Sequence, residues 1–123
     1  MARFHYEGTV TTTKSKQECI DGIKKTLSGL GGKVVSNTAQ DTFTSSLGNN
    51  MMFRFLGAFL ASDSMWPMIA NIKLEEDGAG HVLKITVEED FGFGTLFGVE
   101  TKFREKVEKR KNTIEEKLST FLG

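Results

Sequence analysis

The segment from Met68 to Glu88 contains two runs in which apolar and polar residues alternate, separated by a short glycine-containing stretch. A period of two residues is typical of a β-strand with one buried face, and two such runs around a turn predict a β-hairpin. The residues expected on the apolar face are Met68, Ala70, Ile72 and Leu74 in the first run, and Leu83, Ile85 and Val87 in the second.

A turn centred on Gly78 and Ala79 gives this hairpin a single favourable register. The apolar residues of the two strands then face each other one to one: Leu74 and Leu83, Ile72 and Ile85, Ala70 and Val87. A shift of one residue would oppose apolar to polar side chains along the whole hairpin. The pattern therefore predicts the pairing of the two strands as well as their existence.

Two other stretches repeat their apolar residues at helical spacing. The first begins at Ser15 and Glu18, which have the spacing of a capping box, and it ends at the glycines of residues 29–32. Its buried stripe would be Ile20, Ile23, Leu27 and Leu30, with Cys19 beside them. The second is a long amphipathic helix from about Thr101 to Leu122. Its stripe would be Phe103, Val107, Ile114, Leu118 and Phe121.

Further short segments have strand patterns, whereas the conformation of residues 57–66 and 91–98 stays open. The additional strands are expected at residues 3–12, 33–37, 42–47 and 51–56. Strands joined by short connections pair as antiparallel neighbours, and each amphipathic helix needs an apolar surface to cover. We therefore expect a single α+β domain over residues 1–123. It would have a curved antiparallel sheet of about six strands, in the order β-α-β5-α, with both helices on one face.

This element order resembles the TATA-binding-protein-like and helix-grip (START-like) architectures, in which an antiparallel sheet wraps around a C-terminal helix. The resemblance covers the whole chain and rests on topology, with no sequence motif. The part between the first strand and the sheet is shorter than in full START-like domains, which place two helices there. In helix-grip proteins the space between helix and sheet often holds an apolar ligand. The resemblance implies the same here, although a fold does not specify a function.

The composition narrows the class of protein. The chain has 16 basic and 16 acidic residues, and this formal net charge of zero disfavours a nucleic-acid partner. The single cysteine, Cys19, excludes an internal disulfide and is typical of a reducing compartment. No apolar run approaches the ~20 residues of a membrane span, and the first ten residues lack the apolar core of a signal peptide. We expect a cytoplasmic protein without a membrane span.

The chemically reactive side chains form no recognisable catalytic or metal-binding set. No nucleophile, base and orienting acid come together in the predicted fold, so we expect no enzymatic activity and no cofactor. The acidic triplets at residues 75–77 and 88–90 fall at opposite ends of the hairpin, where each is expected to be solvated. His5 and His81 are isolated. Cys19 lies in the first turn of a helix, where the helix dipole can lower a thiol pKa, but it also fits a small buried side chain.

Two functions remain open, and the one we favour is the non-enzymatic binding of an apolar small molecule between the sheet and the C-terminal helix. Such sites are concave and mostly apolar. The expected lining is Met68, Ile72, Leu83, Ile85, Phe103 and Val107, with Phe93 and Phe97 near the mouth.

The alternative is a protein interaction domain, for example a homodimer, with no ligand cavity. Residues 51–68 and the glycine-aromatic segment 91–98 hold more apolar side chains than one strand face can bury, and methionine-rich surfaces suit varied partners. The expected interface residues are Met52, Phe53 and Trp66. The mixed charges of the C-terminal helix are instead typical of a solvated face with ion pairs one turn apart.

Overall fold

The computed structural model describes residues 5–48, 67–89 and 100–123 of the chain. The described elements are β1 (His5–Thr12), α1 (Lys16–Gly29), β2 (Lys33–Ser36), β3 (Thr42–Leu47), β4 (Met68–Asp77), β5 (Gly80–Glu89) and α3 (Glu100–Leu122). The predicted α+β class and the two predicted helices are confirmed. The strand expected at residues 51–56 lies outside the described residues.

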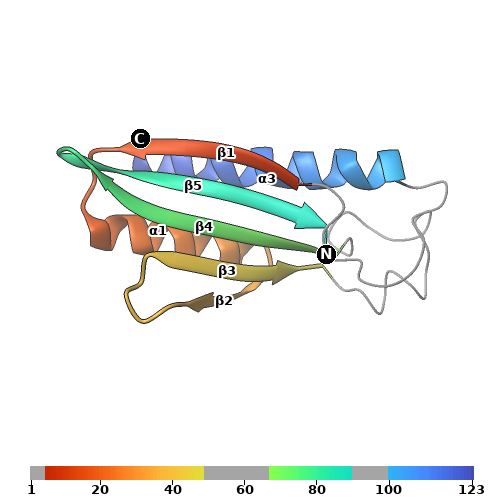
Figure 1. Ribbon diagram of the computed structural model, residues 1–123, viewed down its shortest axis with the longest axis horizontal. Helices are drawn as coiled ribbons and strands as arrows, with labels where there is room; N and C mark the ends of the chain where they lie inside the picture. Colours follow the sequence, from red (N-terminus) through yellow and green to blue (C-terminus); the bar gives the residue numbers. More distant parts are fainter. Residues whose placement is uncertain (1–4, 49–66, 90–99) are drawn as a thin grey trace.

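The five described strands form one antiparallel sheet in the order β1-β5-β4-β3-β2 (Figure 1). Sequence reasoning anticipated the β2–β3 and β4–β5 pairs, but not that β1 would lie beside β5 or that β3 would pair directly with β4. β3 pairs directly with β4, so the place between these two strands is not available to a further strand.

The central hairpin has the predicted register. Leu74 pairs with Leu83, and the two further apolar pairs follow in step. Asp77 pairs with Gly80, which leaves Gly78 and Ala79 as the two loop residues. Gly78 has a φ of +61°, as the first loop residue of a type II′ turn requires, and glycine adopts this conformation without steric cost.

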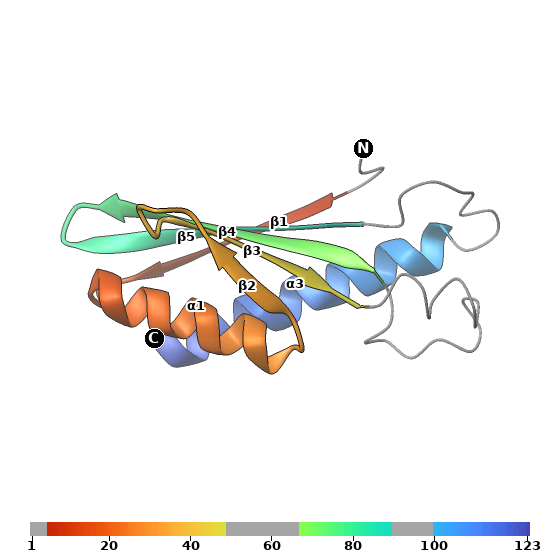
Figure 2. The ribbon, with the colours of Figure 1, turned by 90° about the horizontal axis from the view of Figure 1, so that it is seen from below.

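Both helices lie on the same face of the sheet (Figure 2), as expected, and no helix of the described part of the chain covers the opposite face. α3 packs against β1 and β5, while α1 packs against α3 and β2. This arrangement, an antiparallel sheet with a long C-terminal helix along one face, is the one that the helix-grip resemblance implied. The core consists of the inward side chains of the sheet and the apolar stripes of the two helices.

The ends of α1 have the predicted chemistry. The Ser15 hydroxyl accepts a hydrogen bond from the backbone N–H of Glu18 (3.2 Å), and the Glu18 carboxylate accepts from the backbone N–H of Ser15. The helix closes in a Schellman motif, in which Gly32 N–H donates to the Leu27 carbonyl and Gly31 has a φ of +86°. The glycine cluster therefore stops the helix for the reason that the sequence indicated.

The apolar stripe of α3 differs from the prediction at its last position. Phe121 is 43% exposed, whereas Leu122 is buried. The Phe121 ring lies instead over Gly22 of α1, whose missing side chain makes room for it, and beneath the ammonium group of Lys25. The stripe turns at its end because α3 packs there against α1 as well as against the sheet.

A buried hydroxyl joins the end of β1 to the end of α3. Thr12 Oγ1 donates a hydrogen bond to the carbonyl of Leu122 (2.7 Å) and accepts one from the backbone N–H of Lys14 (3.1 Å). One side chain thus satisfies a carbonyl of the last helical turn, which has no partner within the helix, and an N–H of the β1–α1 connection.

Replacing Thr12 by valine keeps the shape of the side chain but removes both hydrogen bonds. We expect Thr12→Val to lower the free energy of unfolding by about 1–3 kcal/mol, because two polar groups would lose their partner. Thr11→Val, on the exposed face of the same strand, is the matched control and should change it by less than about 0.5 kcal/mol. Urea titration followed by circular dichroism measures both, and equal stabilities of the two variants would show that the Thr12 hydrogen bonds do not stabilise the fold.

Gly80 and Gly29 offer a second matched pair. A Cβ at Gly80 would collide with the backbone carbonyl of Thr12, which no side-chain rotation can relieve, whereas a Cβ at Gly29 meets no atom within 4 Å. We expect Gly80→Ala to destabilise by about 1–3 kcal/mol through strain. Gly29→Ala should be neutral or stabilise by about 0.5 kcal/mol, because alanine favours the helix. Thermal unfolding measures the stability of both variants, and a Gly29→Ala protein less stable than Gly80→Ala would contradict this expectation.

Candidate functional site

The structure brings six of the eight predicted ligand-lining residues together between the sheet and α3. They come from β4 (Met68, Ile72), β5 (Leu83, Ile85) and α3 (Phe103, Val107), and all belong to one apolar cluster. Each has 0–1% of its surface accessible. Phe93 and Phe97 lie outside the described residues, as do the predicted interface residues Met52, Phe53 and Trp66.

The apolar layer is continuous because the strand register aligns the inward side chains in rows. Ile72 pairs with Ile85, and Met68 pairs with Glu89 at the other end of the hairpin. β4 is the central strand of the sheet and lies above the line along which α1 and α3 meet. The layer is therefore enclosed by the sheet on one side and by two helices on the other.

Two polar side chains interrupt the layer, and sequence reasoning missed both. Ser45 points inward between Phe43 and Leu47, and its buried hydroxyl has no hydrogen-bond partner among the described residues. The Ser45 side chain packs against Gly32 so closely that a Cβ on residue 32 would collide with it. The period of two in residues 43–47 was the signal that could have identified Ser45 as inward-facing.

Glu89 is the second. We expected the triplet at residues 88–90 to be solvated, but Glu89 is 5% exposed and faces the core at the end of β5. The separation of the two triplets is confirmed, since Glu76 pairs with His81 near the turn and Glu88 pairs with Ile69 at the far end. In the part of the chain that the structure describes, no three His, Cys, Asp or Glu residues are placed to hold a metal ion.

The opposite face of the sheet carries a polar hollow of about 480 Å³, which sequence reasoning also missed. It spans four strands and is lined by Glu7, Gly8, Thr9, Thr42, Asn71, Lys73, Lys84, Ile85 and Thr86. The alternation in the central hairpin already predicted that Lys73 and Lys84 point outward. The hollow itself depends on the pairing of β1 with β5 and of β3 with β4, which is not local in sequence.

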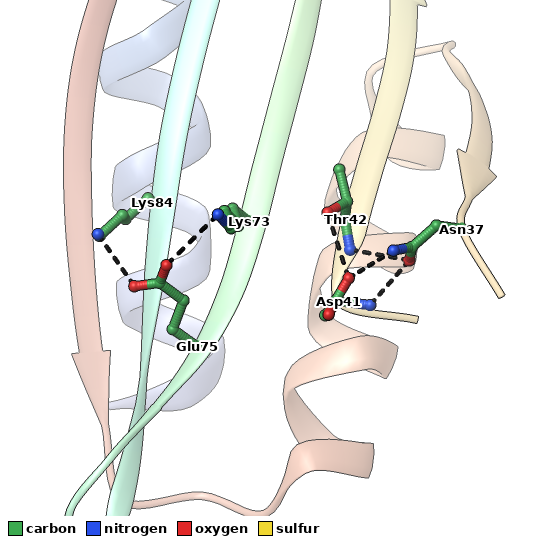
Figure 3. A network of polar contacts seen from close by, with 6 residues as sticks. All are labelled: Asn37, Asp41, Thr42, Lys73, Glu75 and Lys84. Carbon is green, nitrogen blue, oxygen red and sulfur yellow. Dashed lines mark hydrogen bonds and ion pairs between the residues drawn. The ribbon is translucent and has the colours of Figure 1, made fainter. Parts of the chain in front are cut away.

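A shared carboxylate joins the two lysines of this hollow (Figure 3). Glu75 lies 2.9 Å from the Lys84 ammonium group and 3.6 Å from that of Lys73. The hydrogen bond from Lys84, together with the positive charges of both lysines, holds the pKa of Glu75 below its usual value. The carboxylate is therefore ionised at neutral pH and partly neutralises two neighbouring cations.

The rim of the hollow at Thr42 is fixed by a polar turn (Figure 3). The Asn37 side-chain oxygen accepts hydrogen bonds from the backbone N–H groups of Asp41 (3.0 Å) and Thr42 (3.1 Å). The Asn37 amide in turn donates to the Asp41 carboxylate, which is the largest cause of its lowered pKa. The Asp41 carbonyl accepts from Leu74 N–H (2.7 Å), so the turn is tied to β4.

The histidines and the charged face of α3 make local polar contacts. His81 Nδ1 lies 3.0 Å from the Lys14 carbonyl, and exposed His5 lies near Glu7. The expected ion pairs one turn apart are represented by Lys111 and Glu115 (3.3 Å). Lys111, however, is not simply solvated, because its stem packs over Gly8 of β1 and its side chain is 16% exposed.

Cys19 is fully buried, which confirms the interpretation as a small core side chain. Burial, followed by the negative charge of Glu18, raises the pKa of its thiol. The helix N-terminus, which can lower a thiol pKa, is therefore outweighed here by loss of solvent.

We expect the native protein to resist thiol reagents. At pH 8, Cys19 should react with 5,5′-dithiobis(2-nitrobenzoate) at least about tenfold more slowly than the same chain in urea, because the reactive thiolate is both disfavoured and inaccessible. A native rate equal to the unfolded rate would contradict the burial. A rate that keeps rising with pH above the pKa of a free thiol, about 8.5, instead of levelling off there, would agree with the raised pKa.

Across the described residues, neither helix has the length and apolarity that crossing a membrane requires.

Comparisons with known proteins identify no family. No protein-family model matches the sequence, and no curated protein sequence does. Among solved structures, the chain is similar to one titled "Crystal structure of Ara h 8.0201", with 13% sequence identity and a TM-score of 0.48, over 95% of this chain and 98% of that chain. A similarity at this level adds nothing to what the strands and helices themselves show.

Proposed function

We propose that this protein is a non-enzymatic binding module that takes up an apolar small molecule between the sheet and α3. The observation that supports the proposal is the convergence of six predicted lining residues, from three separate elements, in one continuous apolar layer. A ligand buried there would gain about 25 cal/mol for each Å² of apolar surface removed from water.

Binding at this layer requires α3 to move relative to the sheet. The six side chains have 0–1% accessible surface, so they contact one another and their neighbours without room for a water molecule. β4 begins, β5 ends and α3 begins at the same end of the molecule (Figure 1). Separation of the first turns of α3 from this end of the sheet would expose Met68 and Phe103 first, and a ligand would replace contacts within the apolar cluster to which both belong.

The polarity of the layer limits the chemistry of the ligand. Its wall is aliphatic and aromatic, and the polar groups on the inward face of β3 and β5 are the Ser45 hydroxyl and the Glu89 carboxylate. Small-molecule sites of this kind orient a mostly apolar ligand with a few polar contacts. We therefore expect a predominantly hydrocarbon molecule with at most one or two hydrogen-bonding groups.

Two phenylalanines of the same helix provide the test. Phe103 faces the layer and is fully buried, whereas Phe121 is 43% exposed. We expect Phe103→Ala to weaken binding of 1-anilinonaphthalene-8-sulfonate at least about tenfold, or 1.4 kcal/mol, and Phe121→Ala to leave it within about twofold. Fluorescence titration measures both, and circular dichroism confirms that each variant is folded. Ile72→Val, a milder change in the same layer, should weaken binding in the same direction.

Native mass spectrometry of the purified protein distinguishes the two functions. Extra mass that is lost on denaturation supports the ligand. An empty monomer whose probe binding is unchanged by Phe103→Ala and Ile72→Val refutes the proposal. A dimer without extra mass favours the interface alternative. In the described part of the surface the large exposed apolar side chains are Val35 and Phe121, which lie apart on β2 and α3, so such an interface would depend on other residues.

A further inference from the structure

The centre of the outward sheet face is a row of four polar residues, one from each of four neighbouring strands. Strand register places Thr9 opposite Lys84, Lys84 opposite Lys73, and Lys73 opposite Thr42. The next row on the side away from the hairpin turn contains Glu7, Thr86, Asn71 and Thr44. The hollow of about 480 Å³ lies over these two rows.

The two lysines carry more positive charge than their shared partner neutralises. Like charges directly opposite each other destabilise a strand pair, and Lys73 and Lys84 occupy such a position in the middle of the sheet. Glu75 contacts both ammonium groups from the side of the hairpin turn. Each ammonium group has three donors, so most of them stay available to an acceptor on the opposite side, where the hollow lies.

The hollow also has a carboxylate at its edge. Glu7 lies on β1, one of the two edge strands, and its carboxylate is 3.7 Å from His5 Nε2. Its strand partner is Thr86, so neither lysine is directly opposite it. Its negative charge therefore makes the β1 side of the hollow unfavourable for an anion. The centre of the hollow, between Asn71 and the two lysines, is left as the most positive position.

Neutral donors surround this position. The hydroxyls of Thr9 and Thr86 and the amide of Asn71 make no hydrogen bond within the described residues. Thr42 is held in place by the Asn37 turn. None of the lining side chains is aromatic, so the hollow offers no stacking platform for a nucleic-acid base. Ammonium, hydroxyl and amide donors around one point suit an oxyanion, whose several oxygen atoms each accept hydrogen bonds.

We propose that the outward hollow is a second binding site, in which Lys73, Lys84 and Asn71 hold a phosphate group. The site is independent of the apolar layer, because the sheet separates the two. Glu75 acts as a resident counterion that the phosphate group joins on the opposite side of the lysine pair.

Titration of the ¹⁵N-labelled protein with sodium phosphate, followed by NMR, tests the site. We expect saturable shifts at the amides of Lys73, Lys84 and Asn71. The double variant Lys73→Gln, Lys84→Gln should weaken the affinity at least about tenfold. Lys33→Gln is the matched control, because Lys33 lies on the same face at the edge strand β2, outside the hollow, and should leave the affinity within about twofold.

Glu75→Gln gives a result of opposite sign. Removing the resident carboxylate should tighten phosphate binding severalfold, because the two ammonium groups then lose the anion that contacts both of them. The affinity should also fall as sodium chloride is raised. A variant that merely disturbed the sheet would weaken binding instead.

A parallel titration with glycerol 3-phosphate identifies the source of the group. Tighter binding than inorganic phosphate indicates a phosphorylated small molecule, and equal binding indicates free phosphate; both support the site. Shifts that do not saturate, an affinity unchanged in the double lysine variant, or weaker binding by Glu75→Gln would overturn the proposal.

Discussion

The register of the β4–β5 hairpin is the constraint on which the rest of the structure depends. Side chains alternate between the two faces of a sheet, so one choice of register assigns every residue of both strands to a face. The pairing of Ile72 with Ile85 builds the centre of the apolar layer, and the pairing of Lys73 with Lys84 builds the centre of the polar hollow. A slip by one residue would bury the lysines and expose the layer that α3 covers.

Contacts between the ends of the chain complete the fold. β1 closes the sheet beside β5, and Thr12 binds the last turn of α3 across a sequence separation of 110 residues. Such contacts form only after a long loop has closed, and their entropic cost grows slowly with loop length. β1, α3 and the central hairpin therefore stabilise one another, because none of them buries its apolar face alone.

The sheet separates two chemically different surfaces. Its inward face is apolar apart from a few polar groups. Among them, Ser45 has no hydrogen-bond partner in the described part of the chain, and Glu89 faces the core at one end. Its outward face is polar, with a like-charge pair held by one carboxylate. The two proposed sites differ accordingly, since one depends on displacing packed side chains and the other on filling an open polar hollow.

The sequence by itself determined the local structure of this protein. The period of two in residues 68–88 specified the hairpin and its register, and the capping box with the glycine cluster specified both ends of α1. It also placed six lining residues on faces that could meet. These features depend on residues that are close together in the chain, so they can be recognised from the sequence. Tertiary structure alone decided that β1 lies beside β5, that Phe121 packs on Gly22 rather than in the core, that Glu89 is buried, and that four strands form a hollow around Lys73. Each of these depends on which distant segment packs against the residue. The spacing of residues along the chain does not specify which distant segments will be in contact.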